Sequence, residues 1–380
     1  DRLTSPVSQS MTDAPRWIWL LPLLGGLLLR LQPTLPSHRV RRRSLVVALL
    51  TLVVALCVFL FFSDSSSAFQ AGHGAIGWRR LARYYHVGAD GLSGLLVPLT
   101  ATLGVCITLA SPSAPLTPRL ASRMLLSLGA VLGALVALDA LILALFWTLS
   151  LLPLARELAA RQGREERTAA GIFRFMLAGS ALPFFAFCLG LAVPGVLSAE
   201  AIAQGRFDLV ALAQPGAFAS PSAAMLLGGL LLVACLARIG CFPFHLWIAP
   251  LSNHGPGPLS MVTFSTPLGI FVIARLLLPI FPQVCHAAFP YLLPLSVLSA
   301  LYAAVVGLGQ HDLRRALGYF WMSQQGFLLA GLSSLTVEGI SGALLHSMGT
   351  VIVRSGLVLI AAAVVARAGT SDVRFLGGFA

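Results

Sequence analysis

Residues Arg238 to Trp247, which read Arg-Ile-Gly-Cys-Phe-Pro-Phe-His-Leu-Trp, follow a long apolar run and decide how the chain folds. They place a cation, the helix-ending residues Gly240 and Pro243, and His245 at membrane depth. A backbone N–H or C=O group without a partner costs several kcal/mol in a bilayer, so a broken helix persists only where protein or a water-filled cavity encloses it. A buried charge at that depth is also costly and often marks an ion pathway. The stretch therefore indicates transport through a membrane.

The composition assigns the chain to the polytopic α-helical membrane proteins. Of its 380 residues, 57% are hydrophobic and 10% are charged, whereas soluble domains carry about 25% charged residues. About eleven segments are long and apolar enough to form membrane helices, and residues 375–380 would begin a twelfth. Because the first residue is Asp and not Met, we expect a fragment or an unusually numbered product. The expected helices lie near residues 17–31, 44–62, 91–111, 121–138, 140–158, 170–194, 222–241, 258–280, 288–308, 315–334 and 340–366.

The net charge of +12 comes from arginines that concentrate in alternate loops. By the positive-inside rule, the richer set of loops faces the cytoplasm, or the matrix of an organelle. The basic residues therefore set the orientation of the helices in the membrane. We expect the lipid bilayer as a partner, and we expect no nucleic acid to bind. The richer set holds Arg39, Arg41, Arg42, Arg43, Arg119, Arg123, Arg156, Arg161, Arg164, Arg167, Arg314, Arg315, Arg367 and Arg374. The opposite set holds mainly Arg79, Arg80, Arg83 and Arg206.

Residue types further limit the chemistry. The chain has no lysine, and arginine effectively never loses its proton, so no relay within it can use lysine. Its six cysteines show no CxxC or Cys/His spacing, so we expect no metal, disulfide or cofactor. Residues 68–87, rich in aromatic and basic side chains, are typical of a stretch that lies on the outer membrane surface.

Five segments together resemble one family in order and spacing, and the resemblance covers nearly the whole chain from Trp17. The segments are HVGADGLSGLLVPLTATLGV (86–105), LDALILALFWTLSLLPL (138–154), ARIGCFPFHLWIAPLSNHGPGPLS (237–260), GQHDLRRALGYFWMSQQGFLLAGL (309–332) and residues 342–380. They resemble the antiporter-like subunits of respiratory complex I, Mrp-type cation/proton antiporters and membrane hydrogenases. The match is closest to the subunit M branch, called subunit 4 in mitochondria.

The resemblance implies an all-α polytopic membrane protein with the antiporter-like fold. That fold has about fourteen helices and two inverted five-helix repeats, of which about 11–12 helices would be present here. We expect residues 1–380 to form a single transmembrane domain. The first repeat would span about 121–280, and the second about 288–380 and be incomplete.

The resemblance also implies a proton path, from which this chain departs. In the family, a glutamate on the fifth helix pairs with a lysine on the seventh, and a further lysine lies on the eighth. Here the first two positions hold Thr148 and Arg238, and the third falls at or near Pro267. Arg238 would then be a buried cation without its usual carboxylate, a loss that typically costs about 3–5 kcal/mol unless something compensates.

The remaining candidates for the path lie in later helices and beside the break. Histidine positions of the family fall at Gln324 and near Thr350, which has His346 and Arg354 one turn away on either side. His245 matches a family position and would either relay protons or bond freed backbone.

Acidic residues at helix starts have two interpretations. Asp139 would either pair with a buried arginine or, as the more common alternative, cap a helix at the outer interface. For Asp90 and Asp312 we expect capping.

The function implied by the resemblance is that of a membrane-arm subunit of a proton-pumping NADH-quinone oxidoreductase. It would provide a half-channel whose altered relay residues reduce or abolish transport, with no redox site or cofactor of its own. Its partners would be L- and N-type neighbours, in a bacterial plasma membrane or, alternatively, a mitochondrial inner membrane. Two alternatives remain. One is a related subunit of a membrane hydrogenase, an Mrp-type antiporter or an inorganic-carbon uptake complex, and the other is a non-transporting scaffold.

Overall fold

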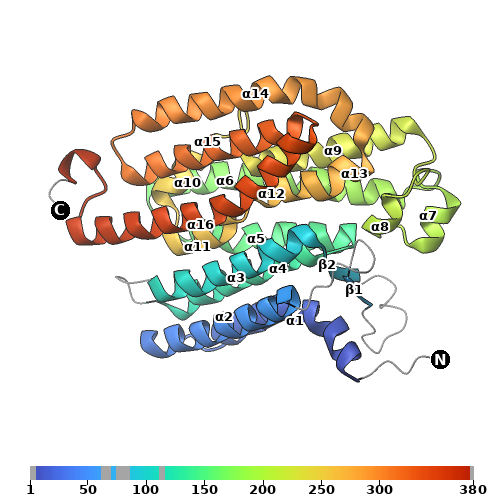
Figure 1. Ribbon diagram of the computed structural model, residues 1–380. Coiled ribbons are helices and arrows are strands. Elements are labelled where there is room, and N and C mark those ends of the chain that lie inside the picture. The colour runs from blue at the N-terminus through green and yellow to red at the C-terminus, as the bar shows by residue number, and fades with distance from the viewer. Residues whose placement is uncertain (1–5, 61–69, 74–85, 111–115, 377–380) are drawn as a thin grey trace.

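Long helices lie side by side along most of the molecule in a computed structural model that describes residues 6–60, 70–73, 86–110 and 116–376 (Figure 1). Most of the expected interfacial stretch at 68–87, and the end of the expected twelfth helix, lie outside these residues. The long helices are α1 (Pro6–Arg30), α2 (Ser37–Leu60), α3 (Gly91–Ala110), α4 (Pro118–Val136), α5 (Ala140–Ala159), α6 (Arg164–Ala192), α9 (Pro221–Ile239), α14 (Pro282–Leu308), α15 (Leu313–Ser333) and α16 (Val337–Ala368).

Within the described part of the chain, nine helices are long and apolar enough to cross a membrane, one of them the interrupted helix Val262–Ile280. Every one coincides with an expected span. The other two expected spans are α1 and α15, which carry polar groups within the helix, such as Arg16 and Gln324. They are nevertheless held in the bundle, α1 against α4 and α15 against α14 and α16.

Contacts between loops place the arginine-rich connections at one end of the bundle. Arg41, at the start of α2, donates to the carbonyl of Leu109 at the end of α3. Arg161, after α5, donates to the carbonyl of His254 at 2.9 Å. Because these contacts join loops of the predicted inner set, the structure agrees with the charge pattern.

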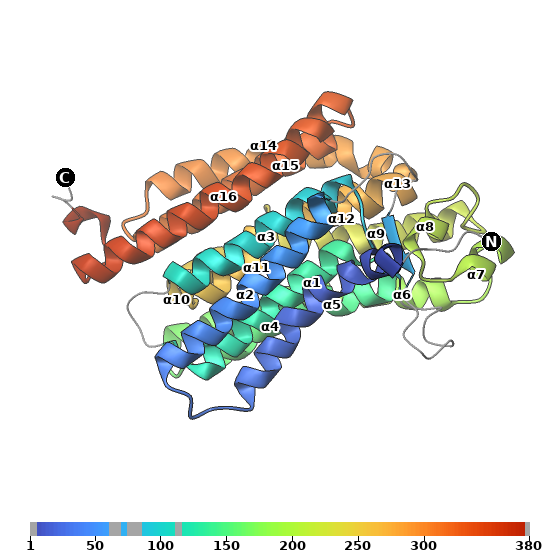
Figure 2. The same ribbon diagram turned by 60° about the horizontal axis from the view of Figure 1, so that its bottom comes forward.

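The opposite end carries short elements that the sequence does not predict. Strand β1 (Gln70–His73) pairs antiparallel with β2 (His86–Ala89), and the short helices α7 (Ala199–Gln204) and α8 (Leu209–Leu212) lie nearby (Figure 2). The isolated bridge between Asp139 and Asp208 ties the start of α5 to this end.

Two helices are interrupted in the middle of the fold. The first, α9, ends at Ile239, and the chain then turns through Gly240 and a cis Phe242–Pro243 bond into α10 (Ile248–His254). The second consists of α11 (Gly257–Ser265) and α12 (Leu268–Val272), which Thr266 and Pro267 separate. It continues through the π-helical turn η2 (Ile273–Leu277) into α13 (Leu278–Ile280).

Gly240 ends α9 for two physical reasons. Its φ of 73° lies in the left-handed region that side chains disfavour. A Cβ atom there would lie 2.8 Å from Ile248 and 2.9 Å from the ring of Trp247. The break therefore depends on glycine both for its backbone angle and for the close return of α10.

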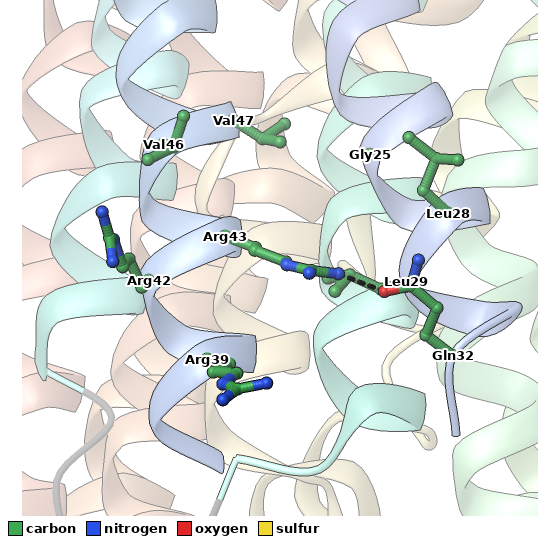
Figure 3. A pocket seen from close by; sticks show the side chains of 9 residues that line it. All are labelled: Gly25, Leu28, Leu29, Gln32, Arg39, Arg42, Arg43, Val46 and Val47. Atoms are coloured by element: carbon green, nitrogen blue, oxygen red, sulfur yellow. Dashed lines mark hydrogen bonds between the residues drawn. The ribbon is translucent and has the colours of Figure 1, made fainter. Parts of the chain in front are cut away.

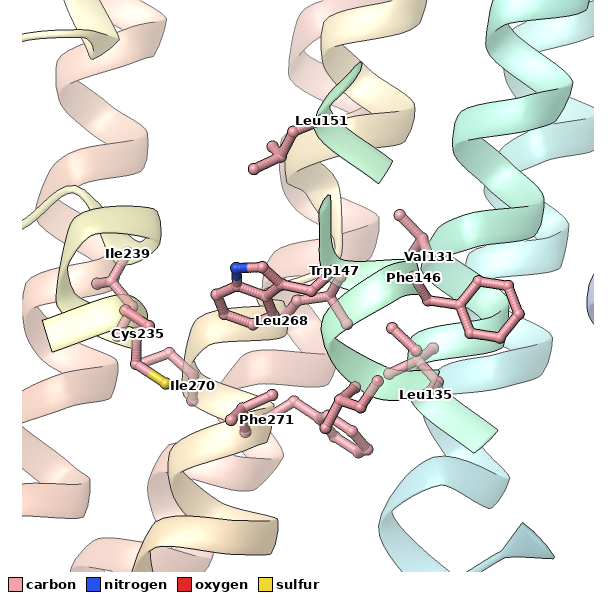
Figure 4. Packing of buried hydrophobic residues seen from close by; sticks show 14 of the residues in the cluster. Val131, Leu135, Phe146, Trp147, Leu151, Cys235, Ile239, Leu268, Ile270 and Phe271 are labelled. Atoms are coloured by element: carbon pink, nitrogen blue, oxygen red, sulfur yellow. The ribbon is translucent and has the colours of Figure 1, made fainter. Parts of the chain in front are cut away.

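An apolar core surrounds the region between the two breaks. Trp147 and Leu151 of α5, Cys235 of α9 and Phe271 of α12 are all buried, and Figure 4 shows them converging with residues of α4. The consecutive helices α4 and α5 thus pack against both interrupted helices. Such enclosure is what broken backbone requires at membrane depth.

A buried ion pair fastens the second interrupted helix to the outer end of the bundle. The Nε atom of Arg275, in η2, lies 3.0 Å from Oδ2 of Asp90, and its Nη1 donates to the carbonyl of Leu135 at 2.6 Å. Asp90 also accepts from the backbone N–H of Ser93 at 2.6 Å, so it caps α3 as the sequence predicts. The ion pair itself is not predicted from the sequence.

We expect Gly240→Ala to destabilise the chain by at least about 1–2 kcal/mol, the cost of a side chain in the left-handed region. The midpoint of thermal unfolding in detergent is the measurement. Gly229→Ala, in the same helix and with nothing within 4 Å of an added Cβ, is the matched control and should leave the midpoint unchanged or raise it. Equal midpoints for the two variants would contradict the role of Gly240.

Replacing Asp90 with Ala should lower the unfolding free energy by about 3 kcal/mol, because it leaves a buried guanidinium without its carboxylate. Asp312→Ala removes a helix cap at the exposed start of α15 and should cost only about 1 kcal/mol. Chemical denaturation of both variants compares the two losses. The ion pair is not structural if Asp90→Ala costs no more than Asp312→Ala.

Candidate functional site

Arg238 is buried in the last turn of α9, where its side chain is held by α5. Its exposed fraction is 3%. Its Nη1 donates to the carbonyl of Trp147 at 2.9 Å, and its Nη2 donates to the hydroxyl of Ser150 at 2.8 Å. The guanidinium carbon also lies 4.4 Å from the centre of the Trp147 ring. The cation therefore makes three different contacts with a single turn of α5.

These contacts stand where a carboxylate would be expected. Among the described residues, no carboxylate oxygen lies within 4.0 Å of Arg238. The carbonyl ends of a helix attract positive charge in its last turn, and a desolvated cation over an indole ring gains up to about 2 kcal/mol. The helix end, the carbonyl, the hydroxyl and the indole together compensate for the absent partner.

The residues predicted to accompany Arg238 do other work. Thr148 donates its hydroxyl to the carbonyl of Ala144 at 2.9 Å, within its own helix. Asp139 caps α5 by accepting from the N–H groups of Leu141 and Ile142, at 2.9 and 3.0 Å. Capping was the more common of its two interpretations, and the hydrogen bonds of Arg238 go elsewhere. The roles of Thr148 and Asp139 in transport stay predictions, and these contacts do not favour them.

Trp147 and Ser150 are the partners that the sequence analysis missed. They flank Thr148, and residues three apart in a helix share one face. An aromatic and a hydroxyl residue on one face, opposite a buried arginine, is the signal that could have identified them.

A series of hydrogen bonds between polar groups leads from Arg238 toward the second interrupted helix. The Ser127 hydroxyl donates to the carbonyl of Ser150 at 2.8 Å and lies 3.0 Å from the hydroxyl of Thr263 on α11. Both hydroxyl side chains are buried. A carbonyl accepts hydrogen bonds but cannot pass on a proton, so the protein groups alone do not form a complete proton wire.

A second polar cluster lies where α15 and α16 meet. It surrounds a cavity of about 130 Å³ lined by Phe320, Trp321, Gln324, His346, Gly349, Thr350, Val353 and Arg354. Nε2 of His346 lies 2.9 Å from Oε1 of Gln324. The cavity has room for about four water molecules at their liquid volume. The structure thus brings together the predicted site residues of the later helices.

Arg354 connects this cavity to the break in the second interrupted helix. Pro267 has no N–H to donate, and the N–H of Leu268 donates to Thr266 at 2.9 Å, so the carbonyl of Phe264 loses its usual helical donor. Arg354 donates to that carbonyl instead. Its guanidinium also lies 4.2 Å from the centre of the Trp321 ring. Pro267 thus acts by exposing a backbone oxygen.

Aromatic rings pack around the same break. Trp247, which follows the first break, has its ring centre 4.8 Å from Phe264 and 5.4 Å from Trp321. We call the groups around Arg238 and Arg354 the two arginine clusters. Thr263 belongs to the first through its contact with Ser127, and Phe264 belongs to the second through its bond with Arg354. These two residues are neighbours in α11. The two clusters are therefore linked through two consecutive residues of one helix.

His245 lies outside both clusters. It is half-buried, stacks on Phe242 with ring centres 5.5 Å apart and meets the ring of Tyr302, on α14, at 5.3 Å. Its contacts are those of an aromatic packing residue beside the break. A relay role for it stays a prediction.

Comparison with known proteins finds relatives along nearly the whole chain. A family model described as "NADH:quinone oxidoreductase/Mrp antiporter, TM" matches residues 137–380. The chain is 28% identical to NAD(P)H-quinone oxidoreductase chain 4 of Gloeobacter violaceus, over 96% of the chain and 68% of the relative. It is 27% identical to NADH-quinone oxidoreductase subunit M of Mycobacterium tuberculosis, over 95% and 71%. It spans about two thirds of the length of the curated relatives.

Solved structures share the fold. The respiratory complex I of Thermus thermophilus contains a chain with 26% identity and a TM-score of 0.77, over 96% of this chain and 73% of that one. The Mrp complex from Dietzia sp. gives a TM-score of 0.74 at 19% identity, over 95% and 38%. These likenesses confirm the predicted all-α antiporter-like fold. The chain belongs to the NADH:quinone oxidoreductase/Mrp antiporter transmembrane family.

Proposed function

We propose that this integral membrane protein is a membrane-arm subunit of a proton-pumping NADH- or NAD(P)H-quinone oxidoreductase, of the chain 4 or subunit M type. Its relatives carry these names over nearly the whole of its length. The observation that carries the proposal is the buried Arg238 at an enclosed helix break, because a charge at that depth marks an ion pathway. Its partners would be L- and N-type neighbours in a bacterial plasma membrane.

The half-channel we propose uses a fixed cation where the family uses a titrating lysine. A guanidinium keeps its proton under all ordinary conditions, so Arg238 cannot pick up and release the transported proton. The positive charge of Arg238 would instead set the electrostatic potential that acts on protons held by water molecules in the path. His346, whose imidazole nitrogens can both donate and accept hydrogen bonds, would carry protons in the cavity beside Gln324.

The repeat organisation expected from the resemblance is part of the proposal. We propose that residues 121–280 form the first inverted repeat and residues 288–380 an incomplete second one. Discontinuous helices near the membrane midplane are typical of transporters built from such repeats. Both breaks described above fall within the first of these segments.

A scaffold without transport is the second candidate, and the contacts of Arg238 favour it. Two hydrogen bonds and an indole ring hold the guanidinium. An arginine held in this way contributes packing and charge balance without any proton exchange. The two candidates predict different responses to restoring the missing pair.

Restoring the pair in Thr148→Glu/Arg238→Lys should raise proton uptake per NADH oxidised, since an opposite charge nearby lets a buried lysine titrate. The measurement is dye-monitored acidification in vesicles that contain the whole complex. Thr148→Gln/Arg238→Lys is the matched control and should show no gain. If the unaltered complex already pumps at the full ratio and the restored variant pumps less, the altered relay is refuted.

Removing the imidazole of His346 tests the second cluster. His346→Leu should lower proton uptake severalfold while NADH oxidation in uncoupled vesicles stays nearly unchanged, because the redox sites lie in other subunits. His286→Leu, an exposed histidine of α14, is the control and should leave both rates as they are. Equal uptake in the two variants would favour the scaffold.

A further inference from the structure

A cavity of about 640 Å³ opens where the end of α1 meets the start of α2 and shares no lining residue with the two arginine clusters (Figure 3). It lies at the arginine-rich end of the bundle, which faces the inner membrane surface by the positive-inside rule. The residues that line it are Gly25, Leu28, Leu29, Gln32, Arg39, Arg42, Arg43, Val46 and Val47. It therefore combines a basic rim with an apolar wall.

None of the described residues that line the cavity is acidic. Residues 16–60, which contain both helix segments, hold no Asp or Glu. Arg43 donates to the side chain of Gln32, as the dashed line in Figure 3 shows. The side chains of Arg39 and Arg42 make no hydrogen bond or ion pair with any other described residue. They lie one helical turn apart on α2 and are exposed.

The apolar wall continues from the rim toward the middle of the membrane. Leu28 of α1 and Val46 of α2 both line the cavity and are 58% and 49% exposed, and Figure 3 shows the neighbouring Val47 directed toward α1. Gly25 permits the close approach of the two helices at the far end, since a Cβ there would lie 2.8 Å from both methyl groups of Val47. The wall is therefore closed at depth and open at the charged end.

We propose that this cavity binds an anionic phospholipid. Its phosphate would lie between Arg39 and Arg42, because guanidinium groups bind phosphate oxygens in a bidentate manner. The first part of an acyl chain would cover Leu28 and Val46. Basic pockets between membrane helices at the inner surface are the sites where acidic headgroups bind. A free phosphate would satisfy the rim but leave the wall bare, so the wall identifies a lipid.

The test measures the affinity of the purified, lipid-depleted complex for dispersed phosphatidylglycerol and for phosphatidylcholine with the same acyl chains. Arg39→Gln/Arg42→Gln should weaken phosphatidylglycerol binding on the order of 30-fold, from the usual contribution of a basic residue near an anionic membrane. Arg314→Gln/Arg315→Gln, an arginine pair at the same end but outside the cavity, should change it less than twofold. Leu28→Gln should weaken it with the rim intact.

Three results would overturn the proposal. Equal affinities for the two lipids would remove the role of charge. Competition by inorganic phosphate at equal concentration would identify a site for a free anion. Capture of a neighbouring protein chain by a photoreactive residue at the position of Val46 would identify a subunit contact. Because the readout is lipid binding, none of these results depends on whether the complex pumps protons.

Discussion

The enclosure of Arg238 is the constraint on which the centre of this molecule depends. A permanent positive charge, buried at the end of an interrupted helix, must be stabilised by groups that stay in place. α5 supplies them with one carbonyl, one hydroxyl and one indole face. The packing of α4, α5, α9 and α12 around Trp147 fixes the positions of these three groups. The polar contacts of Arg238 therefore depend on the apolar core.

Much of the architecture is predictable because membrane helices must satisfy their own backbone and present apolar surface. Length, apolarity and arginine distribution therefore predict the spans and the end of the bundle where each loop lies. The sequence also predicts local features of the helix ends. Asp312 caps α15 and Gly240 ends α9. Contacts between distant segments are not readable in this way. Arg354 reaches a carbonyl 90 residues away and Asp90 pairs with Arg275, because three-dimensional proximity leaves no periodic trace in a sequence.

The two arginine clusters are built in the same way. In each, a guanidinium hydrogen-bonds to a backbone carbonyl and lies over a tryptophan ring. Carbonyl dipoles and indole faces both attract positive charge, so these cations are stabilised without a carboxylate. Each helix break therefore carries a permanent positive charge that is held in place by its neighbours.

The bond between Arg354 and the carbonyl of Phe264 has a mechanical consequence. It joins the longest helix of the described chain, α16, to the one point in α11 and α12 where the backbone is not self-supporting. A sliding or tilting movement of α16 would therefore load the hinge at Pro267 directly, while the intact helices on either side would resist. A force on α16 would thus reach the break at Pro267 through contacts that include the Arg354 guanidinium.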